Sequence, residues 1–271
     1  MGKVWMIASG KGGVGKSTLT ANLGRALARQ GRKACIVDAD IGLRDQDVLL
    51  GLESRVVFDL LDVASGECPL AQALIRPAGE TKLSLLPASQ FARAKDLDPK
   101  AFQKVLAELK YRFDVVLIDC PAGIERSLRG LMNKEIHETV VVCTPDDVCI
   151  RNVERVIPIM TKKELPRPRV IVNRLIPDLV RSGEMNSAQT VANILDVPLL
   201  GEVPDDPSVY RATLQHVSVM DIDCEARKAL ARIAGRMTGK DTPLPAYGAA
   251  SLPWYRRLLP SGPKEVKRLD R

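Results

Sequence analysis

The sequence predicts an α/β protein with a mainly parallel, doubly wound sheet and helices on both of its faces. Two observations predict this fold. Short apolar runs alternate with amphipathic helical stretches along most of the chain, which is the pattern of parallel strands joined by helical crossovers. In addition, the glycine-rich segment 10–18 follows the first apolar run and opens the first helical stretch. A chain of 271 residues is long enough to bury a core and form one such domain.

Each element follows from its own local pattern. The run 114–119 is strongly β-branched, as expected of a buried strand, whereas 17–30 has helical spacing and Gly31 is placed to stop it. The predicted strands are 3–8, 33–38, 83–86, 114–119, 139–144, 169–173 and 199–203. The predicted helices are 17–30, about 100–111, 125–135, 147–162, 187–195, 207–215 and 223–238.

The glycine-rich segment satisfies the phosphate-loop pattern G-x-x-x-x-G-K-[ST]. Its glycines allow a tight turn that brings backbone N–H groups close to phosphate oxygens at a helix N-terminus. Lys16 is expected to reach the β- and γ-phosphates of a nucleotide, and the Ser17 hydroxyl to ligate Mg²⁺. A turn without a ligand is the alternative, but the preceding strand and following helix favour the fold of P-loop NTPases. The predicted cofactor-binding residues of the loop are Gly10, Lys11, Gly12, Gly13, Val14, Gly15, Lys16, Ser17 and Thr18.

Acidic residues end two of the predicted strands, where ligands bind in sheets of this kind. Asp119 is predicted to hold the magnesium ion through water, opposite Ser17. Asp38 and Asp40 lie on the same side of an extended backbone, so both are expected near the γ-phosphate, one beside the metal and the other orienting water. A plain strand-end cap is the alternative for Asp119, and a solvated turn is the alternative for 38–40.

Composition limits the other classes of function. No apolar run approaches the roughly 20 residues that span a bilayer, and the chain enters its first strand without a secretory signal. The six cysteines form no C-x-x-C pair, which predicts buried free thiols in a reducing cytoplasm and argues against an iron–sulfur carrier. The two histidines have no spacing that suggests a metal site.

The basic excess of the chain is concentrated at its C-terminus. Of the net charge of +7, residues 251–271 carry six basic and two acidic side chains, or +4. We expect an ATPase-like domain over 1–240, a Pro-, Gly- and Ala-rich linker over 241–250 and a tail over 251–271. The tail has the composition of a short amphipathic helix on an anionic membrane. Its alternatives are a disordered basic tail and a nucleic-acid contact. The predicted membrane-contacting residues are Leu252, Trp254, Tyr255, Arg256, Arg257, Leu258 and Leu259.

A second lysine in the loop, Lys11, completes the sequence K-G-G-V-G-K-S-T. This sequence resembles the deviant Walker A loop of the ParA/MinD family of dimerising ATPases. The segments D-I-G-L-R at 40–44, P-A-S-Q at 87–90 and P-A-G-I-E at 121–125 are similar to those of MinD-like members. The resemblance covers roughly residues 1–238. Two positions depart from it, because Asp45 stands in place of the usual asparagine and Ser127 in place of a glycine.

The resemblance implies ATP hydrolysis by an attacking water with Mg²⁺ as cofactor. Lys11 would cross to the nucleotide of the other subunit and stabilise the transferred charge, so that hydrolysis requires a homodimer, and Asp40 would position the water. The catalytic residues implied are thus Lys11, Lys16 and Asp40, and the metal residues are Ser17, Asp38 and Asp119. The adenine would be bordered by Asn173, Arg174, Pro204 and Asp206.

The resemblance also implies a cellular role. The ATP-bound dimer would lie on the inner face of the cell membrane, held by anionic lipid, as a peripheral cytoplasmic protein. There it would recruit a septum inhibitor of the MinC type and respond to a stimulating partner of the MinE type, with no nucleic acid involved. The alternatives are a ParA-type ATPase that positions DNA or cargo and a regulator of flagellar number.

Overall fold

A seven-stranded sheet forms the centre of the computed structural model, which describes residues 1–123, 126–215 and 217–245. All seven predicted strands are present within one or two residues of their predicted ends, and every strand pairing in the sheet is parallel. The order across the sheet is β3-β2-β4-β1-β5-β6-β7. The strands are β1 (Lys3–Ser9), β2 (Ala34–Asp38), β3 (Leu83–Leu86), β4 (Val115–Asp119), β5 (Glu138–Cys143), β6 (Arg169–Leu175) and β7 (Leu199–Pro204).

Seven of the helices correspond to predicted ones. They are α1 (Lys16–Arg29), α5 (Pro99–Arg112), α6 (Arg126–Leu131), α7 (Asp147–Lys162), α9 (Ala188–Ile194), α10 (Pro207–Leu214) and α11 (Glu225–Met237). The prediction was wrong at the end of α6, which stops before 135. Asn133 explains the early stop, because its side chain donates to the Leu131 carbonyl and accepts from the Glu135 N–H.

Short helices between the predicted elements were not expected. They are α2 (Gln46–Leu50), α3 (Leu60–Ser65), α4 (Leu70–Ala73) and α8 (Pro177–Ser182), together with three 3₁₀ turns at Glu53–Arg55, Ala94–Asp96 and Val219–Asp221. Each spans fewer than two turns, so none has a periodic apolar face that a sequence pattern can reveal.

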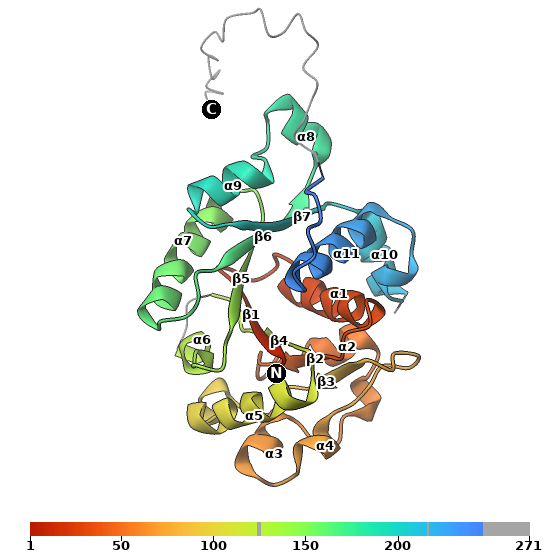
Figure 1. Cartoon of the computed structure of the whole chain (residues 1–271), viewed down its shortest axis with the longest axis vertical. Helices are drawn as coiled ribbons and strands as arrows, with labels where there is room; N and C mark the ends of the chain where they lie inside the picture. Colours follow the sequence, from red (N-terminus) through yellow and green to blue (C-terminus); the bar gives the residue numbers. More distant parts are fainter. Residues whose placement is uncertain (124–125, 216, 246–271) are drawn as a thin grey trace, which may run out of the picture.

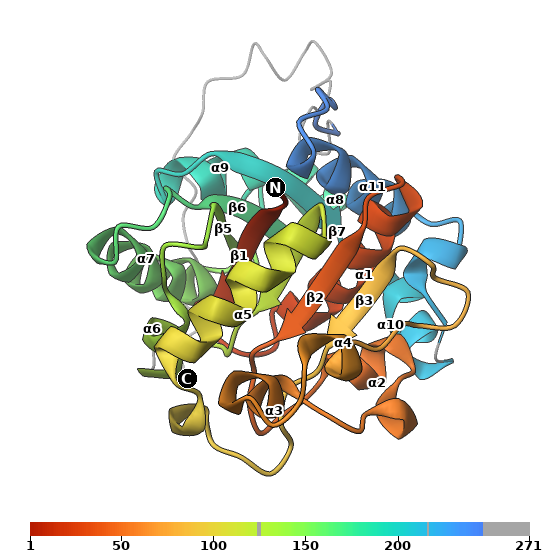
Figure 2. The ribbon, with the colours of Figure 1, turned by 60° about the horizontal axis from the view of Figure 1, so that its bottom comes forward.

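Helices cover both faces of the sheet, as predicted (Figure 1). On one face α1 packs against β2, β4 and α11, while α5, α7 and α9 lie on the other. Figure 2 shows α5 lying across the sheet, where it contacts β1 and β4. Because neither face meets solvent, the strands are buried along nearly their whole length, which explains why they read as continuous apolar runs.

Strand register brings the predicted acids together. Asp38 at the end of β2 is the direct partner of Asp119 at the end of β4, and Asp119 is also the partner of Ile7 in β1. The phosphate-loop segment leaves β1 two residues later. The carboxyl edge of the three central strands therefore carries the loop and both acids.

The remaining predictions concern thiols and the tail. The six cysteines are all free, five of them buried and Cys224 half-buried. Within the described part of the chain no helix is long and apolar enough to cross a bilayer. The predicted membrane residues, from Leu252 to Leu259, lie outside the described residues.

Glu202 on β7 provides a test of the packing between β7 and α11. Burial raises the pKa of this carboxyl to about 7, although Arg232 and Arg236 on α11 act in the opposite direction. The folded state therefore holds a proton that the unfolded state releases near its ordinary pKa. This stability is complete at low pH and is lost as the pH rises to about 7.

We expect Glu202→Gln to remove that loss. Thermal unfolding at about pH 5 and pH 8 would check it, with a smaller difference for Glu202→Gln than for wild type. The exposed Glu154→Gln is the control. If Glu202→Gln shows as large a difference between the two pH values as Glu154→Gln does, the prediction is wrong.

Candidate nucleotide-binding site

The glycine-rich loop lies between β1 and α1 and has the backbone that its sequence predicts. Gly13 and Gly15 both have left-handed backbone conformations, with φ of 78° and 88°. A side chain at Gly15 would also lie 2.5 Å from the Asn173 amide nitrogen. The loop encloses a hollow of about 310 Å³, the phosphate hollow. Its lining residues are Ser9, Lys11 to Thr18, Asp40, Leu43, Asp45, Ala122 and Arg174.

Lys16 and Asp119 form a buried ion pair at the base of the loop. The Lys16 Nζ lies 2.7 Å from Asp119 Oδ1, and their side chains are only 6% and 1% exposed. Burial opposes a charged ammonium, but the attraction of Asp119 outweighs it and the pKa of Lys16 is raised. Lys16 also lies 3.2 Å from the Ser17 hydroxyl. Lys16 thus contacts both the hydroxyl and the carboxylate that are predicted to hold magnesium.

The two acids after β2 have different environments. Asp38 is fully buried and accepts the N–H groups of Asp40 and Gln46, each at 3.1 Å. Burial and the neighbouring Asp119 raise its pKa to about 8. Asp40 is half-buried and lines the phosphate hollow, and burial raises its pKa as well. Of the two, only Asp40 lines the phosphate hollow, whereas Asp38 lies behind it beside Asp119.

Gln46 at the start of α2 is a site residue that sequence reasoning missed. Its amide donates to Asp119 Oδ2 at 2.7 Å and to the Ser17 carbonyl at 3.0 Å. No motif marks a glutamine in a predicted loop. Only the unpredicted helix α2 brings this side chain into the interior.

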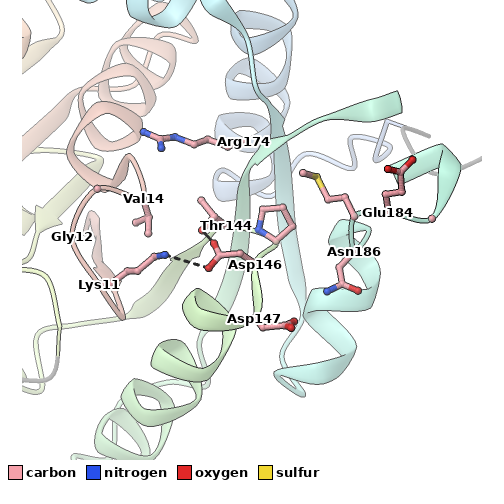
Figure 3. Close-up of a pocket in the computed structure, with 13 residues that line it drawn as sticks. Lys11, Gly12, Val14, Thr144, Asp146, Asp147, Arg174, Glu184 and Asn186 are labelled. Atoms are coloured by element: carbon pink, nitrogen blue, oxygen red, sulfur yellow. Dashed lines mark hydrogen bonds and ion pairs between the residues drawn. The ribbon is translucent and has the colours of Figure 1, made fainter. Parts of the chain in front are cut away.

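Lys11 lines the phosphate hollow, but its ammonium lies at an acid on the other side of the loop. Its Nζ lies 3.2 Å from the carboxylate of Asp146, which begins α7 and also accepts a hydrogen bond from Thr144 (Figure 3). Both partners are substantially exposed, at 36% and 47%. This pair faces a second hollow of about 850 Å³, across which Glu184 and Asn186 lie. An exposed pair of this kind is worth at most about 1 kcal/mol, so Lys11 can leave it easily.

The four residues expected around the adenine line one further hollow of about 430 Å³, the base hollow. The Asn173 side chain reaches the phosphate loop, where its amide donates a hydrogen bond to the Val14 carbonyl at 2.8 Å. Arg174 lines all three hollows described here and has a left-handed backbone, with φ of 60°. A non-glycine residue in that conformation costs about 1 kcal/mol or more, and such strain is concentrated at functional sites. Pro204 ends β7 beside them.

Asp206 has a second task that the sequence did not reveal. Its carboxylate accepts the N–H of Ser208 at 2.9 Å, which caps α10, and the N–H of Ala226 at 3.1 Å near the start of α11. These hydrogen bonds outweigh burial, so the pKa of Asp206 is lowered. Asp206 borders the base hollow, and its main role is to hold the starts of α10 and α11, which form two walls of that hollow.

A buried strand, a glycine-rich loop that opens a helix, and a lysine facing an acid on a neighbouring strand define a P-loop NTPase. A family model described as ParA, NUBPL iron-transfer P-loop NTPase, matches residues 1–238. The chain belongs to the ParA/MinD family, whose general chemistry is nucleotide hydrolysis.

Relatives within this family are septum-site proteins. The chain is 40% identical to the septum site-determining protein MinD of Synechocystis over 253 residues, 92% of this chain and 94% of the relative. It is 42% identical to MinD of Helicobacter pylori over 250 residues, 89% and 92% of the two chains. Among solved structures, a MinC:MinD complex from Aquifex aeolicus matches at 36% identity, with a TM-score of 0.84 over 91% of this chain and 100% of that one. MinD of Pyrococcus horikoshii complexed with Mg-ADP matches at 30% identity, with a TM-score of 0.77 over 88% and 96%.

Proposed function

We propose that this protein is an ATPase that dimerises with ATP, binds the inner membrane surface in that state and positions the division septum by recruiting an inhibitor. The proposal depends most on the phosphate hollow, which Lys16, Ser17 and Asp40 line and behind which Asp38 and Asp119 lie side by side. The MinC:MinD complex among the similar structures supports a MinC-like partner.

The residues present fit a nucleotide with magnesium. Lys16 is a buried ammonium that pairs with the carboxylate of Asp119. When a nucleotide binds with magnesium, a phosphate would take the place of Asp119 at Lys16, and the cation would take the place of Lys16 at Asp119. Ser17 would ligate magnesium directly and Asp119 through water, with Asp38 close behind. The magnesium would neutralise charge on the β- and γ-phosphates. Asn173, Arg174 and Pro204 would hold the base.

Hydrolysis in this proposal needs two copies of the chain. Asp40 would orient the attacking water, because among Asp38, Asp40 and Asp119 it is the one that lines the phosphate hollow. Lys11 would leave Asp146 and reach the phosphates of the partner subunit. The weak, exposed Lys11–Asp146 pair supports this exchange, since little free energy opposes it.

A basic surface at the opposite edge of the sheet supports the membrane part of the proposal. Five cations line a hollow of about 910 Å³ at the amino ends of β2 to β4, and none of its described lining residues is acidic. A smaller hollow is lined by Arg32, which precedes Lys33 in the chain, and by Gly239, which follows α11 on the way to the tail. The tail and the cations would therefore meet the same anionic surface. The five cations are Lys33, Arg55, Arg76, Lys82 and Arg112.

Sedimentation with anionic liposomes tests this proposal. We expect the full chain to bind with ATP and not with ADP, and a chain ending at Ala250 to lose more than about tenfold in affinity because two tails act together in a dimer. Reversing Lys33 and Arg76 to glutamate should weaken binding about fivefold or more per residue, at about 1 kcal/mol each. Neutral liposomes are the control. Failure to bind anionic lipid with any nucleotide, combined with salt-sensitive DNA binding, would favour the ParA-type alternative.

A further inference from the structure

Gln46 connects three segments of the nucleotide site. Its backbone N–H donates to Asp38 at the end of β2, while its side-chain amide donates to Asp119 at the end of β4 and to the Ser17 carbonyl in α1. The residue is completely buried. Thr20 also contacts Asp119 and the Lys16 carbonyl, but it does so from within α1, whereas Gln46 makes its contacts from the segment after β2.

The orientation of this amide is fixed by its neighbours. Asp119 Oδ2 and the Ser17 carbonyl are both acceptors, so the NH₂ group must face them and Oε1 must point the other way. Oε1 is buried and has no hydrogen-bond partner. A buried amide oxygen without a donor is unfavourable, and it marks a place where a ligand can supply one.

We infer that Gln46 is a positioning residue for the magnesium end of the site. It fixes the Asp119 carboxylate through Oδ2, which leaves Oδ1 as the oxygen that Lys16 and Thr20 contact. Its unpaired Oε1 would be available to a hydrogen-bond donor that the bound ligand supplies. The inference rests on the proposed ATP and magnesium site. The inference assigns a role in cation binding to Gln46, a residue of the segment after β2 whose backbone N–H also contacts Asp38.

The test is the magnesium dependence of nucleotide binding, measured without turnover. A fluorescent ADP analogue is titrated into wild type, Gln46→Met and the exposed control Gln72→Met, at several Mg²⁺ concentrations and in EDTA. Methionine matches the length of glutamine but cannot form these hydrogen bonds. We expect Gln46→Met to raise the Mg²⁺ concentration for half-maximal binding about tenfold, the effect of losing a hydrogen bond to a charged group. Binding in EDTA should change less than about threefold.

Each outcome decides the matter. If Gln46→Met lowers binding in EDTA as much as in Mg²⁺, the residue is only structural and the inference is wrong. Unchanged magnesium dependence would also overturn it. Gln46→Leu provides a second variant if the methionine variant does not fold, with thermal unfolding as the check. If wild type itself shows no magnesium-dependent binding, the proposed function fails, and that result differs from any effect of Gln46.

Discussion

Replacing Lys16 by methionine should abolish ATP hydrolysis and destabilise the empty protein at the same time. Hydrolysis should fall by about 100- to 1,000-fold or more, because the variant lacks the buried ammonium at the base of the phosphate hollow. The second effect follows from the ion pair. Asp119 is left buried without its cation, although Gln46 still donates to it. With that donor retained, we expect a loss of about 3 kcal/mol in the free energy of unfolding.

A double variant separates these two effects. In Lys16→Met/Asp119→Asn the new amide has no charge to bury, and the Thr20 hydroxyl, which already donates to the Lys16 carbonyl, can accept from it. Stability should return most of the way to wild type, whereas activity should stay absent. Urea unfolding of the nucleotide-free proteins measures the first quantity, and phosphate release measures the second. Additive losses of stability in the double variant would show that the two residues do not form the pair described here.

The ion pair also shows where sequence reasoning ended. The strands were predictable because each is covered on both faces and therefore reads as a run of apolar residues. The loop and the acids were predictable because their types and spacing are specific to phosphate chemistry. That Lys16 contacts Asp119, 103 residues away, depends on β4 lying beside β1 in the sheet. Local spacing does not contain that order.

Two other features depended on contacts rather than on pattern. Gln46 is buried because α2, a helix of five residues, turns it inward, and so short a helix has no amphipathic signal. Asp206 was expected beside a base, but its carboxylate caps α10 and contacts the start of α11. A carboxylate between two helix N-termini can serve as a cap or contact a ligand. Only the positions of the surrounding N–H groups decide between the two.

Lys11→Ala should stop hydrolysis while leaving nucleotide binding intact. The Lys11 ammonium pairs with Asp146, and no described ion pair or side-chain hydrogen bond joins it to another residue of the phosphate hollow, so its loss should change ADP affinity less than about threefold. Turnover of ATP should fall about 100- to 1,000-fold if the lysine stabilises transferred charge in the partner subunit. Fluorescent ADP binding and phosphate release measure the two quantities.

Mixing two inactive variants tests whether Lys11 acts across the dimer. Asp40→Ala should be inactive because its water is not positioned, but it retains Lys11. In a mixed dimer, the Lys11→Ala subunit has an intact Asp40 and receives Lys11 from its partner, so one of the two sites is complete. Random pairing of equal amounts makes half of all dimers mixed, and activity should recover to about a quarter of the wild-type value. If Lys11 acted within its own subunit, neither site of the mixed dimer would be complete, and the mixture would stay as inactive as its components.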